Sequence, residues 1–255
     1  MTLQVVTIPC LSDNYAYLIR DEETNQVAVV DVPDATPILG ALTDLNWSLD
    51  KILITHHHYD HIDGVDDLRA KTGAKVYGAK ADTHRLPALD VALSEGDKFE
   101  LGAETCDVLD VSGHTIGHIA FVFKNAEAAF SADSLMALGC GRLFEGDAEM
   151  MWGTMKKFKA LSDDTLVYSG HEYTASNAAF AITIEPNNAD LQTRLDDIKD
   201  KRANDIPTVP ASIGLEKATN PFMRANLKEV KALVGMVDAS DADVFGEIRR
   251  RKDNL

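Results

Sequence analysis

Short runs in which apolar and polar residues alternate dominate about the first 170 positions of the chain. Such runs, rich in β-branched residues, predict strands, and segments whose apolar residues recur every three or four positions predict helices. The two kinds of segment follow one another along the chain, which is typical of a layered α/β architecture and not of a helical bundle. The expected strands are 3–8, 15–20, 27–31, 51–55, 75–77, 106–111, 118–123, 128–131 and 166–168.

Two helices are expected among these strands. Asp34 is a suitable N-cap for a helix whose apolar residues Ile38 and Leu42 share one face. A second helix is expected over 65–71, with Gly73 placed to end it.

The pattern changes from about residue 173, where the strand signals stop. A charged amphipathic helix is expected at 188–202, and another helix that carries Leu227, Val230 and Leu233. We therefore predict two domains, 1–172 and 173–255, of which the second is helical.

Composition narrows the kinds of protein to consider. The 255 residues are 45% hydrophobic, which suits a globular chain with a sizeable core. A net charge of −16, from 25 basic and 41 acidic residues, argues against binding to nucleic acid or to an anionic membrane. No membrane-length apolar run and no basic-then-apolar leader is evident, so we expect a cytoplasmic protein. Cys10, Cys106 and Cys140 lie far apart and are expected to be reduced thiols.

A histidine-rich segment follows the strand expected at 51–55. Residues 55–61 read Thr-His-His-His-Tyr-Asp-His and hold four of the eight histidines. Alternate side chains of an extended segment share a face, so His56 and His58 can converge on one metal ion. Asp60 and His61 follow where the chain turns and can reach a second ion. An isolated H-x-H is as readily a surface loop, but the full H-x-H-x-D-H spacing is more specific.

Three more potential ligands each follow an expected strand. They are His114 in Ser-Gly-His-Thr-Ile-Gly-His, Asp133 in Phe-Ser-Ala-Asp-Ser, and His171 in Ser-Gly-His-Glu-Tyr. Together with the first cluster they supply five imidazoles and two carboxylates. This donor set suits zinc, iron or manganese.

These motifs resemble the metallo-β-lactamase superfamily over residues 1 to about 172. The resemblance implies an α/β fold, a four-layered αββα sandwich with the metals at one edge, followed here by a smaller helical domain. It implies two divalent ions, most often zinc, and a hydroxide that bridges them and attacks the substrate. Asp60 and Asp133 are the implied catalytic carboxylates: Asp60 orients the attacking hydroxide, and Asp133 bridges the ions. The implied ligands are His56, His58 and His114 for one ion, and Asp60, His61 and His171 for the other. We expect His57, His84 and His118 not to bind metal.

Other segments resemble the hydroxyacylglutathione hydrolases, the glyoxalase II family. They are 139–146, 170–174 and the Arg249-x-x-Lys252-Asp253 motif. The implied reaction is hydrolysis of S-(2-hydroxyacyl)glutathione thioesters, typically S-D-lactoylglutathione to D-lactate and glutathione, the second step of methylglyoxal detoxification. No nucleic-acid or membrane partner is expected, and the chain is expected to be a monomer. The resemblance implies that the glutathione moiety is bound by Arg142, Phe144, Tyr173, Arg249 and Lys252.

Two alternatives stay open. One is a persulfide dioxygenase-like enzyme with a single iron, and the other is a metal-binding module without activity. Three departures from the family pattern also matter. Phe144 replaces a tyrosine found in some members, which removes a hydroxyl contact to the substrate. Ala132 stands where relatives usually have glycine, and a positive φ there would cost roughly 1–2 kcal/mol. The turn at Asp31 likewise lacks its usual glycine.

Overall fold

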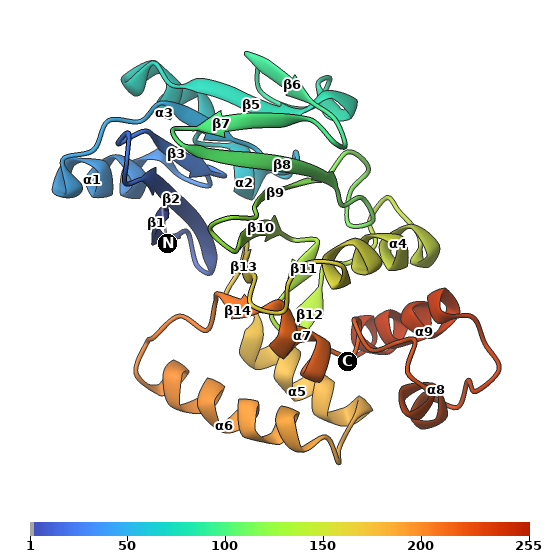
Figure 1. Cartoon of the computed structure of the whole chain (residues 1–255). Helices are drawn as coiled ribbons and strands as arrows, with labels where there is room; N and C mark the ends of the chain where they lie inside the picture. The colour runs from blue at the N-terminus through green and yellow to red at the C-terminus, as the bar shows by residue number, and fades with distance from the viewer. Residues whose placement is uncertain (1–2) are drawn as a thin grey trace. The chain divides into compact units, whose positions relative to one another are not determined.

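The computed structural model describes residues 3–255, which form two compact units (Figure 1). One unit contains residues up to 111 together with 116–132. The other contains 112–115 and 133–255. Both combine strands and helices, so the predicted α/β class is confirmed. Of the described residues, no helix is long and apolar enough to cross a membrane.

The first unit contains a six-stranded sheet with the strands in chain order. The first three strands are antiparallel and joined by tight turns, whereas the last three pair in parallel and need longer crossovers. Most of these strands were expected, but the last of them was not. The strands are β1 (Leu3–Cys10), β2 (Asn14–Asp21), β3 (Val27–Val30), β4 (Lys51–Leu53), β5 (Lys75–Ala79) and β6 (Val91–Leu93).

Helices α1 (Ala35–Leu45) and α3 (Val65–Thr72) form the crossovers between the parallel strands. The side chain of Asp34 accepts a hydrogen bond from the amide of Thr36 at 2.8 Å, so the predicted N-cap is confirmed. The predicted end of α3 is also confirmed, since Gly73 adopts a left-handed conformation with φ 72°.

Four antiparallel strands of the first unit face the six-stranded sheet. Aromatic pairs bridge the two sheets: the ring centroids of Tyr17 and Phe130 are 5.7 Å apart, and those of Tyr77 and Phe99 are 5.1 Å apart. Figure 1 shows α1 and α3 on the other side of the first sheet. Helices therefore cover one face of the six-stranded sheet and strands cover the other, so side chains on both faces of the sheet are buried. The strands are β7 (Lys98–Leu101), β8 (Glu104–Asp110), β9 (Ile119–Phe123) and β10 (Ala128–Ala132).

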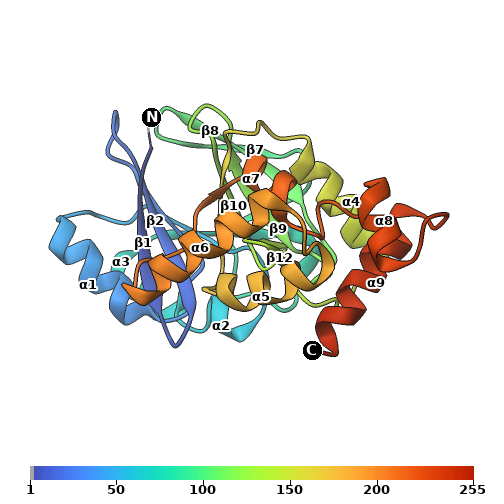
Figure 2. The same cartoon turned by 90° about the horizontal axis from the view of Figure 1, so that it is seen from below.

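The second unit is mainly helical. Figure 2 shows α5 beside α6, and α8 beside α9. The expectation that no strand follows residue 173 is wrong, because β14 pairs with β13. A two-residue strand carries no periodicity, and only its partner reveals it. The elements are β11 (Leu135–Met136), β12 (Gly139–Cys140), α4 (Ala148–Lys159), β13 (Leu166–Ser169), α5 (Thr174–Ile184), α6 (Ala189–Ala203), β14 (Ala211–Ser212), α7 (Ile213–Thr219), α8 (Lys228–Val234) and α9 (Asp241–Asp253).

A buried carboxylate ties the helices of the second unit to the β11–β12 hairpin. Glu216 of α7 is fully buried, and its Oε1 accepts a hydrogen bond from Arg194 of α6 at 2.5 Å. Its Oε2 accepts bonds from the amide of Leu138 and from the side chain of Asn220, both at 2.9 Å. Since the hairpin leads directly to Arg142, this network fixes where the following segment begins.

Candidate functional site

The histidine-rich segment lies between β4 and a single helical turn, α2 (Tyr59–Ile62). The backbone at His58 is extended, with φ −61° and ψ 141°, and the chain becomes helical at the next residue. His56 Nε2 lies 3.2 Å from His58 Nδ1, so these two imidazoles converge. In the helical turn, His61 Nε2 lies 3.9 Å from a carboxylate oxygen of Asp60.

Asp31 fixes the orientation of His61. Its Oδ2 lies 2.8 Å from His61 Nδ1 and accepts the hydroxyl of Thr55 at 2.8 Å, while its Oδ1 accepts the amide of Thr55 at 2.9 Å. A carboxylate only accepts, so the proton of His61 is on Nδ1 and the metal-binding lone pair is on Nε2. Asp31 has φ 56°, a conformation that glycine adopts more easily. The sequence analysis did not identify Asp31 as a site residue, although the absent glycine in its turn was a signal.

Asn14 holds Asp60 in a similar way. Its amide nitrogen donates to the backbone oxygen of Asp60 at 3.0 Å and to Asp60 Oδ2 at 3.1 Å. Asn14 is buried, so these bonds are protected from competing water. The amide thereby directs the other oxygen of the Asp60 carboxylate away from Asn14.

Asp133 brings together two of the other predicted ligands. Its Oδ2 lies 3.5 Å from His114 Nε2 and 3.3 Å from His171 Nε2. His114 Nδ1 is 2.8 Å from the backbone oxygen of Arg142, which leaves the lone pair on Nε2. A Cβ added at Gly141 would lie 2.3 Å from the backbone oxygen of Asp133 and 2.6 Å from His114 Nδ1, so only glycine fits there.

The residue before Asp133 is backbone-strained, as the sequence suggested. Ala132 has φ 42°, in the left-handed region that an L-residue with a Cβ enters at some cost. Its side chain is buried at the end of β10. The sequence analysis gave only the cost of a positive φ at this residue, and the structure shows that the residue has one.

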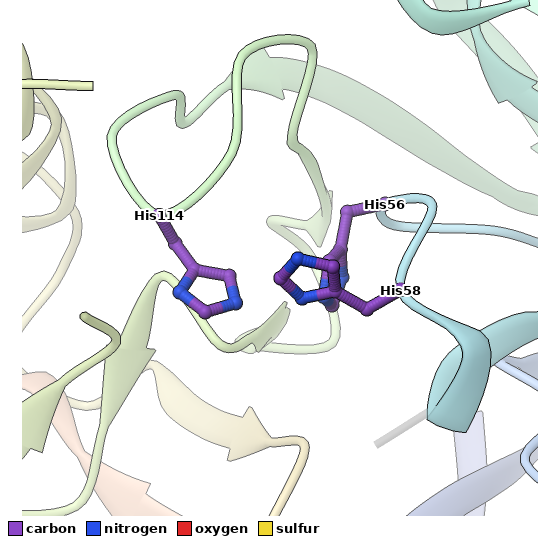
Figure 3. A group of neighbouring side chains, drawn as sticks. All are labelled: His56, His58 and His114. Atoms are coloured by element: carbon purple, nitrogen blue, oxygen red, sulfur yellow. The ribbon is translucent and has the colours of Figure 1, made fainter. Parts of the chain in front are cut away.

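The ligand atoms gather in groups of metal-site dimensions. Those of His56, His58 and His114 lie within 4.8 Å of one another, as do those of Asp60, His61 and His171. Figure 3 shows the His114 ring facing His56 and His58. Two nitrogen ligands 2.0–2.1 Å from a tetrahedral ion are about 3.3 Å apart.

The separations of 3.2, 3.3 and 3.5 Å found among these atoms fit that spacing. Imidazoles and carboxylates, with no thiolate, form the donor set. The residues therefore fit a divalent metal. Asp31 also forms a third group with His56 and His61, but its oxygens already accept hydrogen bonds from His61 and Thr55.

The other three histidines lie outside these groups. His57 Nδ1 is 2.8 Å from Asp82. The ring of His118 stacks on that of His56, with centroids 4.5 Å apart and planes 10° from parallel. His84 is exposed. Among the described residues, none of the three belongs to a potential metal-binding group.

Two predicted substrate contacts lie next to potential metal ligands. The ring of Tyr173 stacks on that of His171, with centroids 4.5 Å apart and planes 5° from parallel. The ring of Phe144 is 5.3 Å from that of His114. Both aromatic side chains, and Arg142 as well, are exposed to solvent. They are accessible to a ligand that approaches the metal-binding residues.

The other two predicted contacts, on α9, are largely buried. Arg249 is 4% exposed and donates to the backbone oxygen of Cys140 at 2.9 Å, while its Nη2 pairs with Asp253 at 2.8 Å. Lys252 Nζ donates to the side-chain oxygen of Asn177. Burial, and secondarily the charge of Arg249, lowers the pKa of Lys252 to about 8.

Asp253 also lies 3.7 Å from Arg142, so one carboxylate links two of the predicted cations. The amide nitrogen of Asn177 donates to the backbone oxygen of Ala137 at 2.9 Å, which fixes the amide oxygen toward Lys252. No sequence signal identified Asn177 as a partner of Lys252, because the two residues belong to different helices.

The fold and the potential ligands define a metal-dependent α/β hydrolase class. Residues 12–171 match the family model described as the metallo-beta-lactamase superfamily. The structure is similar to that of ETHE1 from Myxococcus xanthus, with a TM-score of 0.69 and 25% identity over 100% of this chain and 92% of that one. It also resembles the BLEG-1 B3 metallo-beta-lactamase, with a TM-score of 0.67 and 21% identity over 86% of this chain and 99% of that one. The predicted metallo-β-lactamase fold is thus confirmed.

Residues 172–255 match a more specific model, the hydroxyacylglutathione hydrolase C-terminus. The whole chain is 56% identical to a hydroxyacylglutathione hydrolase from Ruegeria pomeroyi over 255 residues, all of both chains. It is 57% identical to one from Cereibacter sphaeroides over the same extent, and 58% identical to one from a Jannaschia species over 99% of this chain and 98% of that one. The chain belongs to the hydroxyacylglutathione hydrolase family.

Proposed function

We propose that the protein hydrolyses S-(2-hydroxyacyl)glutathione thioesters to glutathione and a 2-hydroxy acid, with S-D-lactoylglutathione as the typical substrate. The observation that carries the proposal is the pair of ligand groups in a chain whose C-terminal third matches the hydroxyacylglutathione hydrolase C-terminus. Full-length identities of 56–57% to hydroxyacylglutathione hydrolases support it.

The protein's own residues would hold two divalent ions, for which zinc is our first choice and iron or manganese the alternatives. His56, His58 and His114 would bind one ion, and Asp60, His61 and His171 the other, with Asp133 bridging them. When bound, such ions supply Lewis acidity toward the thioester carbonyl and toward water. The separations described above support this assignment.

In the proposed reaction, Asp60 accepts a hydrogen bond from the attacking water and so orients it toward the carbonyl carbon. Asn14 holds the Asp60 carboxylate in one rotamer, which reduces the entropy lost in aligning the water. The bond that breaks joins the carbonyl carbon to the glutathione sulfur. Thiols have a pKa of about 8.5, so the thiolate leaves near neutral pH without a separate general acid.

Cations of the second unit would bind the glutathione moiety. Arg249 and Lys252 are proposed to hold its glycine carboxylate, with Arg142, Phe144 and Tyr173 along the rest of the tripeptide. Arg249 Nε is buried and makes no hydrogen bond within residues 3–255, so a donor is available there. Three cations against the single carboxylate of Asp253 give this part of an acidic protein an excess of positive charge, which favours an anion.

The proposed domain division is a catalytic domain at 1–172 and a glutathione-binding helical domain at 173–255. Matches of the two family models to residues 12–171 and 172–255 support it. A monomer located in the cytoplasm, without nucleic-acid or membrane partners, stays a prediction.

Steady-state hydrolysis of S-D-lactoylglutathione, before and after chelation, tests the proposal when metal is counted per chain in the same sample. Rapid, chelator-sensitive cleavage with about two ions per chain supports it. A protein that holds two ions but does not cleave the thioester would contradict the proposed substrate. Oxygen-dependent turnover of glutathione persulfide with one iron per chain would instead favour the dioxygenase alternative.

A further inference from the structure

His57, the middle residue of the three consecutive histidines, makes a contact that the proposed reaction does not use. Its Nδ1 lies 2.8 Å from Asp82 Oδ2, and its side chain is 17% exposed while that of Asp82 is fully buried. The ring of His57 also lies edge-on to that of His58, with centroids 5.0 Å apart and planes at 67°. Both of its chain neighbours are potential ligands of the same ion.

Asp82 connects three segments of the first unit. It ends the 3-10 turn η1 (Lys80–Asp82), and its other carboxylate oxygen accepts a hydrogen bond from Arg85 Nε. Arg85 Nη2 in turn donates to the backbone oxygen of Ile116 at 2.9 Å. Gly117 has φ 90°, and a Cβ there would lie 3.0 Å from Asp82 Cβ, so the loop packs closely against Asp82 at a residue without a side chain. The chain reaches His114 two residues before Ile116.

Both oxygens of this buried carboxylate are therefore engaged, one by His57 from a distant segment and one by Arg85 three residues further along the chain. Such a carboxylate is costly to leave with only one partner, which makes its bonds to His57 and Arg85 mutually dependent. We define His57, Asp82 and Arg85 as the His57 latch. Among the described residues, none of these three belongs to a potential metal-binding group, so the latch does not take the place of a proposed ligand.

We infer that the His57 latch is a positioning group: it holds the backbone between His56 and His58 in the one conformation that lets both imidazoles share an ion. The inference rests on the proposed metal centre. His56 Nε2 and His58 Nδ1 are 3.2 Å apart, close to the separation of about 3.3 Å that a tetrahedral ion requires. A rotation of either peptide plane around residue 57 would move the two rings apart. Because His57 bonds to a fixed, buried partner, that rotation is opposed before any metal arrives.

The test measures metal affinity of the metal-free protein by titration with Zn²⁺ against a competing chelator. Replacement of one outer-shell partner typically lowers metal affinity 10–100-fold. We expect His57→Leu to weaken binding of the ion that His56 and His58 would share about tenfold, toward the lower end of that range because His57 is not itself a proposed ligand. His57→Asn places an amide nitrogen near the position of Nδ1 and should restore affinity to within about threefold of the wild type. His84→Leu, which removes an exposed histidine nearby, should leave affinity unchanged.

A kinetic measurement separates positioning from a merely structural role. In His57→Leu we expect kcat to fall with metal occupancy and to recover with added Zn²⁺, while KM for the thioester changes little. Wild-type affinity in His57→Leu, with only a lower Tm, would overturn the inference. If His57→Leu does not fold, Asp82→Asn takes its place: weaker metal binding with a preserved fold supports the latch, and unchanged binding overturns it.

The same experiment distinguishes a failure of the proposed function from a failure of the inference about the latch. Wild-type protein that binds two equivalents but does not cleave the thioester would discard the substrate, and the affinity comparison would still decide the latch. Wild-type protein that binds no Zn²⁺ would overturn both.

Discussion

The pH dependence of substrate binding should report on Lys252. This residue has a pKa of about 8 because its ammonium group is mostly buried and lies close to Arg249. If the ammonium binds the glycine carboxylate of glutathione, affinity is lost as pH rises through this pKa. The ratio of neutral to charged lysine is about 0.1 at pH 7 and about 10 at pH 9. KM for S-D-lactoylglutathione should therefore rise about tenfold across this range, with a smaller change in kcat.

Two variants serve as controls for this prediction. Lys252→Arg keeps its charge at pH 9, so its KM should stay nearly flat and correct for titration of the substrate itself. Lys252→Met should have a high KM at pH 7 that does not depend on this titration. A wild-type KM that is flat from pH 7 to 9 would refute the reasoning about burial, and a normal KM in Lys252→Met would refute the assigned role.

The same group should affect stability with a definite sign. The pKa of Lys252 is lower in the folded protein than the usual 10.5, so the fold disfavours its ammonium form. That penalty is fully present below about pH 8 and disappears as pH rises through 10.5. The gap corresponds to about 3 kcal/mol, an upper limit on what Lys252→Met can gain, because the bond to Asn177 is lost as well. Thermal unfolding at pH 7 should show a higher Tm for this variant, and a lower Tm would contradict the estimate.

Three further perturbations follow from the structure. Asp133→Ala removes the carboxylate between two imidazoles and should lower both metal content and kcat, whereas full metal content would exclude a bridging role. Arg194→Leu leaves the buried Glu216 without its cation and should lower the free energy of unfolding by about 3–5 kcal/mol in a denaturant titration; a loss below 1 kcal/mol, typical of an exposed pair, would contradict this. Asn14→Ala frees Asp60 to rotate and should lower kcat about 10-fold or more with little change in KM; unchanged kcat would remove Asn14 from the site.

Local sequence signals proved most reliable where a few adjacent residues decide the structure. The cap at Asp34, the stop at Gly73 and most strands of the first sheet follow from residue type and period alone. Helix α4 was not expected, although Asp147 caps it by accepting the amide of Met150 at 2.8 Å. Gly153 in its middle weakens the helical signal. Packing of its apolar face stabilises the helix in spite of that glycine.

The sequence by itself determined the kind of chemistry, because H-x-H-x-D-H spacing places donor atoms within a few ångströms through backbone geometry alone. It could not identify Asn14, Asp82 or Asn177 as partners of site residues. Each bonds to a residue 25 to 75 positions away, at distances set by sheet register and helix packing. Only the tertiary structure decided which carboxylate or amide meets each histidine and lysine, and how deeply Lys252 is buried. Burial and long-range hydrogen bonds, which set pKa values and ligand orientation, exist only once distant segments have packed together.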